Sequence, residues 1–181
     1  MCFSSAQTLP QRALGSTRLP AAYMLTYSTN WRTTVLKTSS WFAVLPARHV
    51  RVGISRGVPR GGSAGSGYKR YSALNPGPWF NSVSVPEYLT RYRDILDKLE
   101  PKKVLDDLKA IAGSGTPVIA CFEAAEKIET GEVWCHRHLV AQWLEDSLGI
   151  EIEELNYPKL DRWAKLRQDG VPPPRWTQRW P

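Results

Sequence analysis

Three consecutive residues, Cys135, His136 and Arg137, bring a thiol, an imidazole and a guanidinium to the start of an expected helix. The peptide N–H groups at a helix N-terminus favour anions and lower the pKa of a nearby thiol. A strand-like run that ends in Cys121 and Glu123 precedes this triplet. Because ligands of parallel sheets bind beyond the carboxyl ends of the strands, the spacing predicts a site at that edge. There, Cys135 would be a nucleophile or anion contact and His136 an acid or base.

Helical spacing sorts the side chains of this segment by direction. His136 and Arg137 share faces with apolar residues, so we expect them to point toward the sheet. His138 aligns with Gln142 and Glu145, so we expect it to face water.

Two further residues join the predicted site from outside the helix. Arg56 follows an expected strand over 50–55, so with Arg137 it could clamp a phosphate from the same edge. Glu123 would orient His136 or Arg137. The candidate catalytic residues are therefore Cys135, His136 and Glu123, and the candidate ligand-binding residues are Arg137, Arg56 and Cys121.

Three interpretations of this cluster compete. Cys135 could be a thiolate nucleophile, although the Cys-x5-Arg pattern of phosphatases is absent. Cys121, Glu123, Cys135 and His136 are possible zinc ligands, but without a CxxC or His-x-Glu pattern we predict no metal site. In a purely structural role, Cys135 would cap the helix, Arg137 would pair with Glu123, and His136 would bond to backbone.

Hydrophobic spacing predicts the elements that must position these residues. We expect strands over 25–28, 50–55, 118–122 and 150–155 and helices over about 84–99, 101–113 and 136–148. The continuous apolar run at 118–122 is typical of a strand buried on both faces. A strand, a helix and a strand in this order form a βαβ unit, which favours an α/β fold with a mainly parallel sheet.

Parts of the chain resemble a known family. Val118-Ile-Ala-Cys-Phe-Glu123 and then Cys135-His-Arg-His-Leu-Val-Ala-Gln-Trp-Leu144 resemble the closing half of the domain of unknown function 488 family. Met24-Leu-Thr-Tyr, Val52-Gly-Ile-Ser-Arg56 and Pro78-Trp-Phe80 are similar to its opening half. The resemblance covers about residues 24–155 and implies a small Rossmann-like three-layer sandwich. The family has no agreed activity, so the resemblance implies a fold rather than a reaction.

The length of 181 residues suits one domain of about 130 residues with loose ends. We expect a disordered basic extension over 1–23, a single domain over 24–156, and a Trp- and Pro-rich tail over 157–181 with a short helix near 160–166. No apolar run is long enough to span a bilayer. Three cysteines without a CxxC pair favour a reducing compartment, and we predict the cytoplasm.

The net charge of +7 is unevenly distributed. No acidic residue precedes Glu87, so the ten Lys and Arg residues of 1–86 give +10, whereas 14 basic and 17 acidic residues give −3 over 87–181. This split indicates either a polyanionic or phosphate-bearing partner or a composition bias. We therefore expect an enzyme that acts on a phosphate-bearing or nucleotide-like ligand. The alternative is a non-catalytic nucleic-acid-binding protein that uses the basic N-terminal half and the aromatic tail. The sequence identifies no cofactor.

Overall fold

The computed structural model describes residues 35–60 and 68–176. The expected extension over 1–23, the expected strand over 25–28 and the end of the tail, 177–181, lie outside the described residues.

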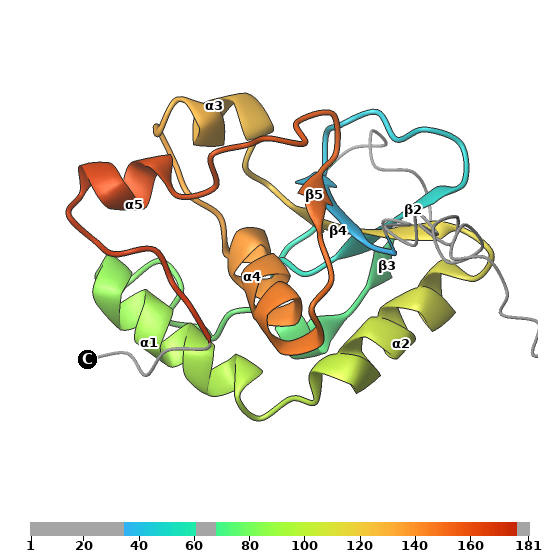
Figure 1. Cartoon of the computed structure of the whole chain (residues 1–181), viewed down its shortest axis with the longest axis horizontal. Coiled ribbons are helices and arrows are strands. Elements are labelled where there is room, and N and C mark those ends of the chain that lie inside the picture. Colours follow the sequence, from blue (N-terminus) through green and yellow to red (C-terminus); the bar gives the residue numbers. More distant parts are fainter. Residues whose placement is uncertain (1–34, 61–67, 177–181) are drawn as a thin grey trace, which may run out of the picture. The chain divides into compact units, whose positions relative to one another are not determined.

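The described chain contains a five-stranded sheet (Figure 1), and its strand order is β3-β2-β4-β1-β5. All neighbouring strands are parallel. The strands are β1 (Lys37–Ser40), β2 (His49–Gly53), β3 (Lys69–Arg70), β4 (Thr116–Cys121) and β5 (Glu153–Glu154). The central strand β4 pairs with β2 and β1, and its register sets Ser40 beside Cys121. The predicted α/β class with a parallel sheet is confirmed.

Three long helices follow the sequence signals closely. They are α1 (Val85–Leu96), α2 (Pro101–Ala112) and α4 (His136–Leu148); the shorter elements are η3 (Ser72–Leu74), α3 (Ala125–Glu129) and α5 (Ala164–Gln168). The Ser84 side chain caps α1 by accepting a hydrogen bond from the Glu87 N–H, and Gly149 ends α4 at φ 65°. Within the described ranges, no helix is long and apolar enough to cross a membrane.

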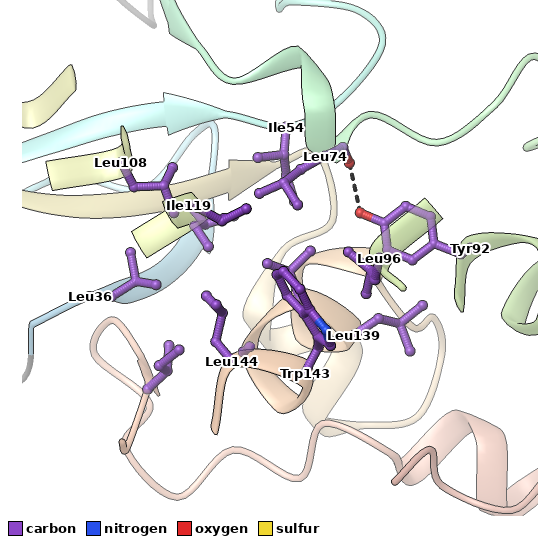
Figure 2. Close-up of a cluster of buried hydrophobic side chains, with 14 of the residues drawn as sticks. Leu36, Ile54, Leu74, Tyr92, Leu96, Leu108, Ile119, Leu139, Trp143 and Leu144 are labelled. Atoms are coloured by element: carbon purple, nitrogen blue, oxygen red, sulfur yellow. Dashed lines mark hydrogen bonds between the residues drawn. The ribbon is translucent and has the colours of Figure 1, made fainter. Parts of the chain in front are cut away.

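One hydrophobic cluster joins these three helices to one face of the sheet (Figure 2). Ile119 of β4 contributes to it together with Leu108 of α2 and Leu144 of α4. On the other face of the sheet, Trp41 lies against Gly53, where an added Cβ would stand 2.1 Å from the indole ring.

The segment after β5 covers the remaining side of α4. Trp163 packs against the main cluster, Leu166 of α5 is fully buried in it, and Arg162 pairs with Glu145 of α4 at 2.7 Å. The expected short helix that packs Trp163 on the domain is therefore confirmed, although it begins at Ala164. As a result, residues 136–144 of α4 are all buried.

Candidate functional site

The carboxyl ends of β2 and β4 lie side by side and lead into the predicted site. The Ile54 N–H donates to the Ala120 carbonyl at 3.0 Å, so the chain that continues to Arg56 runs next to Cys121 and Glu123. Helix α4 begins at this same edge, with Cys135 as its N-cap residue. The fold therefore brings the expected strand ends and the expected helix start together.

A cavity of about 430 Å³ opens at this edge. It is lined by residues of four segments: Ser55, Arg56, Gly57, Pro76, Phe80, Tyr88, Cys121, Phe122, Glu123, Trp134, Cys135 and His136. The exposed side chains Phe80, Phe122 and Arg56 mark its mouth, whereas Cys135 and His136 are buried and mark its inner end. The volume lies in the range of small-molecule sites.

We call the inner group, formed by Cys121, Glu123, Cys135 and His136, the thiol cluster. The Cys135 thiol donates a hydrogen bond to Glu123 Oε2 at 2.8 Å, and Cys121 Sγ lies 3.6 Å from His136 Nδ1. His136 Nε2 is 3.2 Å from the Ile54 carbonyl oxygen. Since a carbonyl oxygen only accepts, Nε2 carries the proton in the neutral ring, and the Nδ1 lone pair faces the cysteines.

Burial and mutual contact shift the ionisation of the thiol cluster. Burial, with the negative charge of Cys135, raises the pKa of Glu123 to about 7. Burial alone would raise the pKa of Cys135, but the contact with Cys121 and the charge of Arg137 outweigh it and hold that pKa well below its ordinary value. The pKa of Cys121 is raised by its contact with Cys135 and by burial. The pKa values of Cys135 and Glu123 are thus shifted in opposite directions, that of the thiol downward and that of the carboxyl upward.

A second buried polar group, which we call the ion-pair cluster, lies beside the first and consists of Thr38, Arg137, His138 and Glu154. Arg137 donates from Nε and Nη2 to the two Glu154 oxygens at 3.1 and 2.9 Å. Thr38 donates to Glu154 at 2.7 Å, and His138 Nε2 donates to it at 3.0 Å. These four side chains are fully or almost fully buried.

The ion-pair cluster favours the charged form of Glu154. Burial alone would raise the pKa of Glu154, but the His138 hydrogen bond and the Arg137 charge lower it to about 2. Burial lowers the pKa of His138, so its ring is neutral. The pair is therefore a neutral unit of one guanidinium and one carboxylate.

The expected orientation of His138 and the expected position of Arg137 at the ligand need correction. The prediction that His138 faces water is wrong, because the side chain is fully buried on Glu154 and next to Trp163. Arg137 points inward as expected, but it does not line the cavity: its guanidinium is fully buried on Glu154 and donates to the Glu123 carbonyl at 2.8 Å. It therefore holds the segment that carries Glu123 and makes no direct contact with the cavity.

Of the three contacts that a purely structural role predicts, one is present and two are absent. The expected bond from His136 to backbone is present, at the Ile54 carbonyl. Cys135 occupies the N-cap position, but its side chain makes no capping hydrogen bond. The partner of Arg137 is the Glu154 carboxylate rather than that of Glu123.

The sequence reasoning missed Glu154 and the aromatic walls of the cavity. Alternation along the expected strand puts Glu154 on the face of the buried Ile152, which was an available signal for a buried carboxylate. Tyr88 and Trp134 meet edge to face at 4.9 Å between ring centroids, and both line the cavity. They come from segments 46 residues apart (134 − 88), and their meeting depends on tertiary packing.

Comparison with protein-family models, curated proteins and solved structures finds no match to this chain. The site must therefore be judged on its own chemistry.

Proposed function

We propose that this protein is an enzyme that acts on a phosphate-bearing or nucleotide-like ligand in the cavity of about 430 Å³. One observation carries the proposal: Arg56 lines the same cavity as the thiol cluster. The ligand would thus have an anionic group at one end and its reacting bond at the other.

Arg56 supports the anionic part of the ligand. Its Nη1 donates to the Pro76 carbonyl at 3.3 Å, which holds the side chain at the cavity. A guanidinium has five N–H donors, so this bond leaves it able to bind phosphate oxygens. The start of α4 adds the positive end of a helix dipole at the same edge.

Aromatic side chains support the nucleotide-like part of the ligand. Phe80, Tyr88, Phe122 and Trp134 line the same cavity as Arg56 and the thiol cluster. Rings of this kind stack on a planar base, and a stacked base contributes about 1–3 kcal/mol. A nucleoside monophosphate combines both features.

The thiol cluster supplies the groups that react. Cys135 and His136 lie at the inner end of the cavity, and Glu123 accepts the hydrogen bond of the Cys135 thiol. Glu123 is thereby placed to accept a proton released next to Cys135.

Calorimetric titration with a nucleoside monophosphate and with inorganic phosphate tests the proposal. The Arg56→Ala variant should bind the nucleotide about 10- to 100-fold more weakly than the wild type, as the loss of a charge-assisted hydrogen bond requires. Arg60→Ala is the matched control, because Arg60 is an exposed arginine of the same segment that does not line the cavity. Equal losses in the two variants, or a wild type that binds neither probe, would contradict the proposal.

The nucleic-acid alternative has less support among the described residues. Several basic residues of the first half bond within the protein: Lys37 pairs with Glu153, Arg51 and Lys69 donate to backbone carbonyls, and Arg70 donates to Ser55 and Arg56 carbonyls. Salt-dependent DNA or RNA binding that survives Cys135→Ser would favour that alternative. Membership of the domain of unknown function 488 family likewise stays a proposal, supported by the segments at 118–123 and 135–144.

A further inference from the structure

The thiol cluster has the ligand atoms and spacing of a transition-metal site. Cys121 Sγ, Cys135 Sγ and a ring nitrogen of His136 all lie within 4.8 Å of one another. Ligands that surround a tetrahedral zinc ion at about 2.0–2.3 Å are separated by about 3.5 Å. The Cys121 Sγ to His136 Nδ1 distance of 3.6 Å already has that value. We infer that Cys121, Cys135 and His136 bind one Zn²⁺ ion.

The hydrogen bond of His136 prepares its ring for this role. Metal-binding histidines commonly donate their second N–H to a backbone carbonyl or a carboxylate, which fixes the tautomer and the ring plane. His136 Nε2 meets the Ile54 carbonyl at 3.2 Å, so in the neutral ring Nδ1 offers its lone pair toward Cys121. Tyr92 contacts the ring edge to face at 5.4 Å between centroids and holds its orientation.

The donor set and its charge select zinc among the common metals. Two thiolates and an imidazole suit a borderline-soft ion, whereas Mg²⁺ and Ca²⁺ prefer oxygen ligands. The two cysteines are 3% and 2% exposed, so two thiolates there require a cation. A divalent ion neutralises both, while the nearest buried cation, Arg137, is already paired with Glu154.

The arrangement around the three ligands is that of an open site. Cys121, Cys135 and His136 all line the cavity, so the fourth coordination position can face it. Glu123 Oε2 lies 2.8 Å from Cys135 Sγ, where the carboxylate can take the fourth position or accept a proton from a bound water. Metal binding stands by itself, but its catalytic use rests on the proposed function. In that case Cys135 is a ligand rather than the nucleophile.

Metal analysis of the purified 181-residue chain, followed by Co²⁺ titration of the chelator-treated protein, tests the inference. The wild type should bind one equivalent and show the intense thiolate-to-cobalt absorption of a tetrahedral site. Cys121→Ser and Cys135→Ser should each lose this absorption and bind at least tenfold more weakly, since even losses outside the ligand set cost that much. Cys2→Ser should bind like the wild type.

A second pair of variants separates metal binding from misfolding. His136→Gln should lose the cobalt spectrum, whereas His138→Gln, which also removes a buried imidazole from the first turn of α4, should keep it. If His136→Gln does not fold, the two cysteine variants decide the matter. A wild type without stoichiometric metal or thiolate absorption would overturn the inference.

The same preparations distinguish the two proposals. Cobalt binding through both cysteines, without nucleotide binding that depends on Arg56, would leave the metal site standing and remove the proposed function. Nucleotide binding that depends on Arg56, without a cobalt spectrum, would do the reverse.

Discussion

Two buried polar clusters share the first turn of α4, and they have opposite properties. Each contains a carboxylate, yet the pKa of Glu123 is raised to about 7 while that of Glu154 is lowered to about 2. Burial favours the neutral acid in both places. The difference is the partner, because Glu154 faces the Arg137 guanidinium whereas Glu123 faces the Cys135 sulfur.

The ion-pair cluster therefore stabilises the fold, whereas the thiol cluster can bind a ligand. In the ion-pair cluster, Arg137, His138 and Thr38 satisfy both oxygens of Glu154, and no ligand is needed. The thiol cluster opens to a cavity and gathers sulfur and nitrogen lone pairs that a cation would stabilise. Within one turn of α4, His136 thus belongs to the thiol cluster, whereas Arg137 and His138 belong to the ion-pair cluster.

The largest effect on the free energy of unfolding should come from removing the Glu154 carboxylate, and removing that of Glu123 should have a much smaller one. Glu154→Gln leaves the buried Arg137 without its counter-ion and should lower the free energy of unfolding by about 3–5 kcal/mol. Glu123→Gln, measured in chelator, should cost about 1 kcal/mol or less, because burial already disfavours the charged form of Glu123 and no buried cation depends on it. Urea denaturation measures both. Similar losses of unfolding free energy in the two variants would contradict the proposed difference between the two carboxylates.

Glu153→Gln serves as the control for position in the strand. Its carboxylate pairs with Lys37 at 2.8 Å but is 30% exposed, so the loss should stay within about 1 kcal/mol.

Acid should weaken the ion-pair cluster in a defined pH range. The folded-state pKa of Glu154 lies below its ordinary value of 4.5, so its contribution is present above about pH 4.5 and is lost as the pH falls toward 2. The loss should amount to about 3 kcal/mol in the wild type. The Glu154→Gln variant shares the other carboxylates and should lack this component in denaturation curves taken across the range. An identical pH dependence in the two proteins would contradict the assignment.

A smaller effect should follow from the hydroxyl of the same cluster. Thr38→Val keeps the shape but removes the donor 2.7 Å from Glu154, which should cost about 1–3 kcal/mol. Thr90→Val is the control, because its hydroxyl bonds on an exposed helix face and should matter by about 0.5 kcal/mol or less. Equal urea midpoints for the two valine variants would contradict a stabilising role for the Thr38 hydroxyl.

The smallest effect on stability should occur in the thiol cluster. In the presence of chelator, Cys135→Ser should change the free energy of unfolding by about 1 kcal/mol or less, because the serine hydroxyl can donate to Glu123 as the thiol does. A loss comparable to that of Glu154→Gln would indicate a structural role for Cys135.

The sequence predicted the elements better than the contacts between them. Proline, glycine and apolar spacing gave α2 and α4 nearly to the residue, because these signals act within the helix itself. The direction of His138 could not be read in this way, since the face that carries it is covered by the segment around Trp163. Helical spacing identifies a polar face, but it does not reveal which distant segment buries that face.

The candidate site could be predicted only in part, because some of its contacts depend on segments that are distant in the sequence. Strand ends and a helix start brought Cys121, Glu123 and Cys135 together, because parallel topology requires it. The role of Arg137 depended on Glu154, which comes from a strand on the far side of β1. Their contact depends on the position of β5 beside β1 in the sheet, and the local sequence does not indicate that position.

The most direct test of the account is an anomalous diffraction map, recorded at the zinc absorption edge from crystals grown with zinc and a nucleoside monophosphate. We predict one strong peak among Cys121 Sγ, Cys135 Sγ and His136 Nδ1, with the phosphate in contact with Arg56. A map with no zinc in the thiol cluster and the nucleotide outside the cavity would contradict the account.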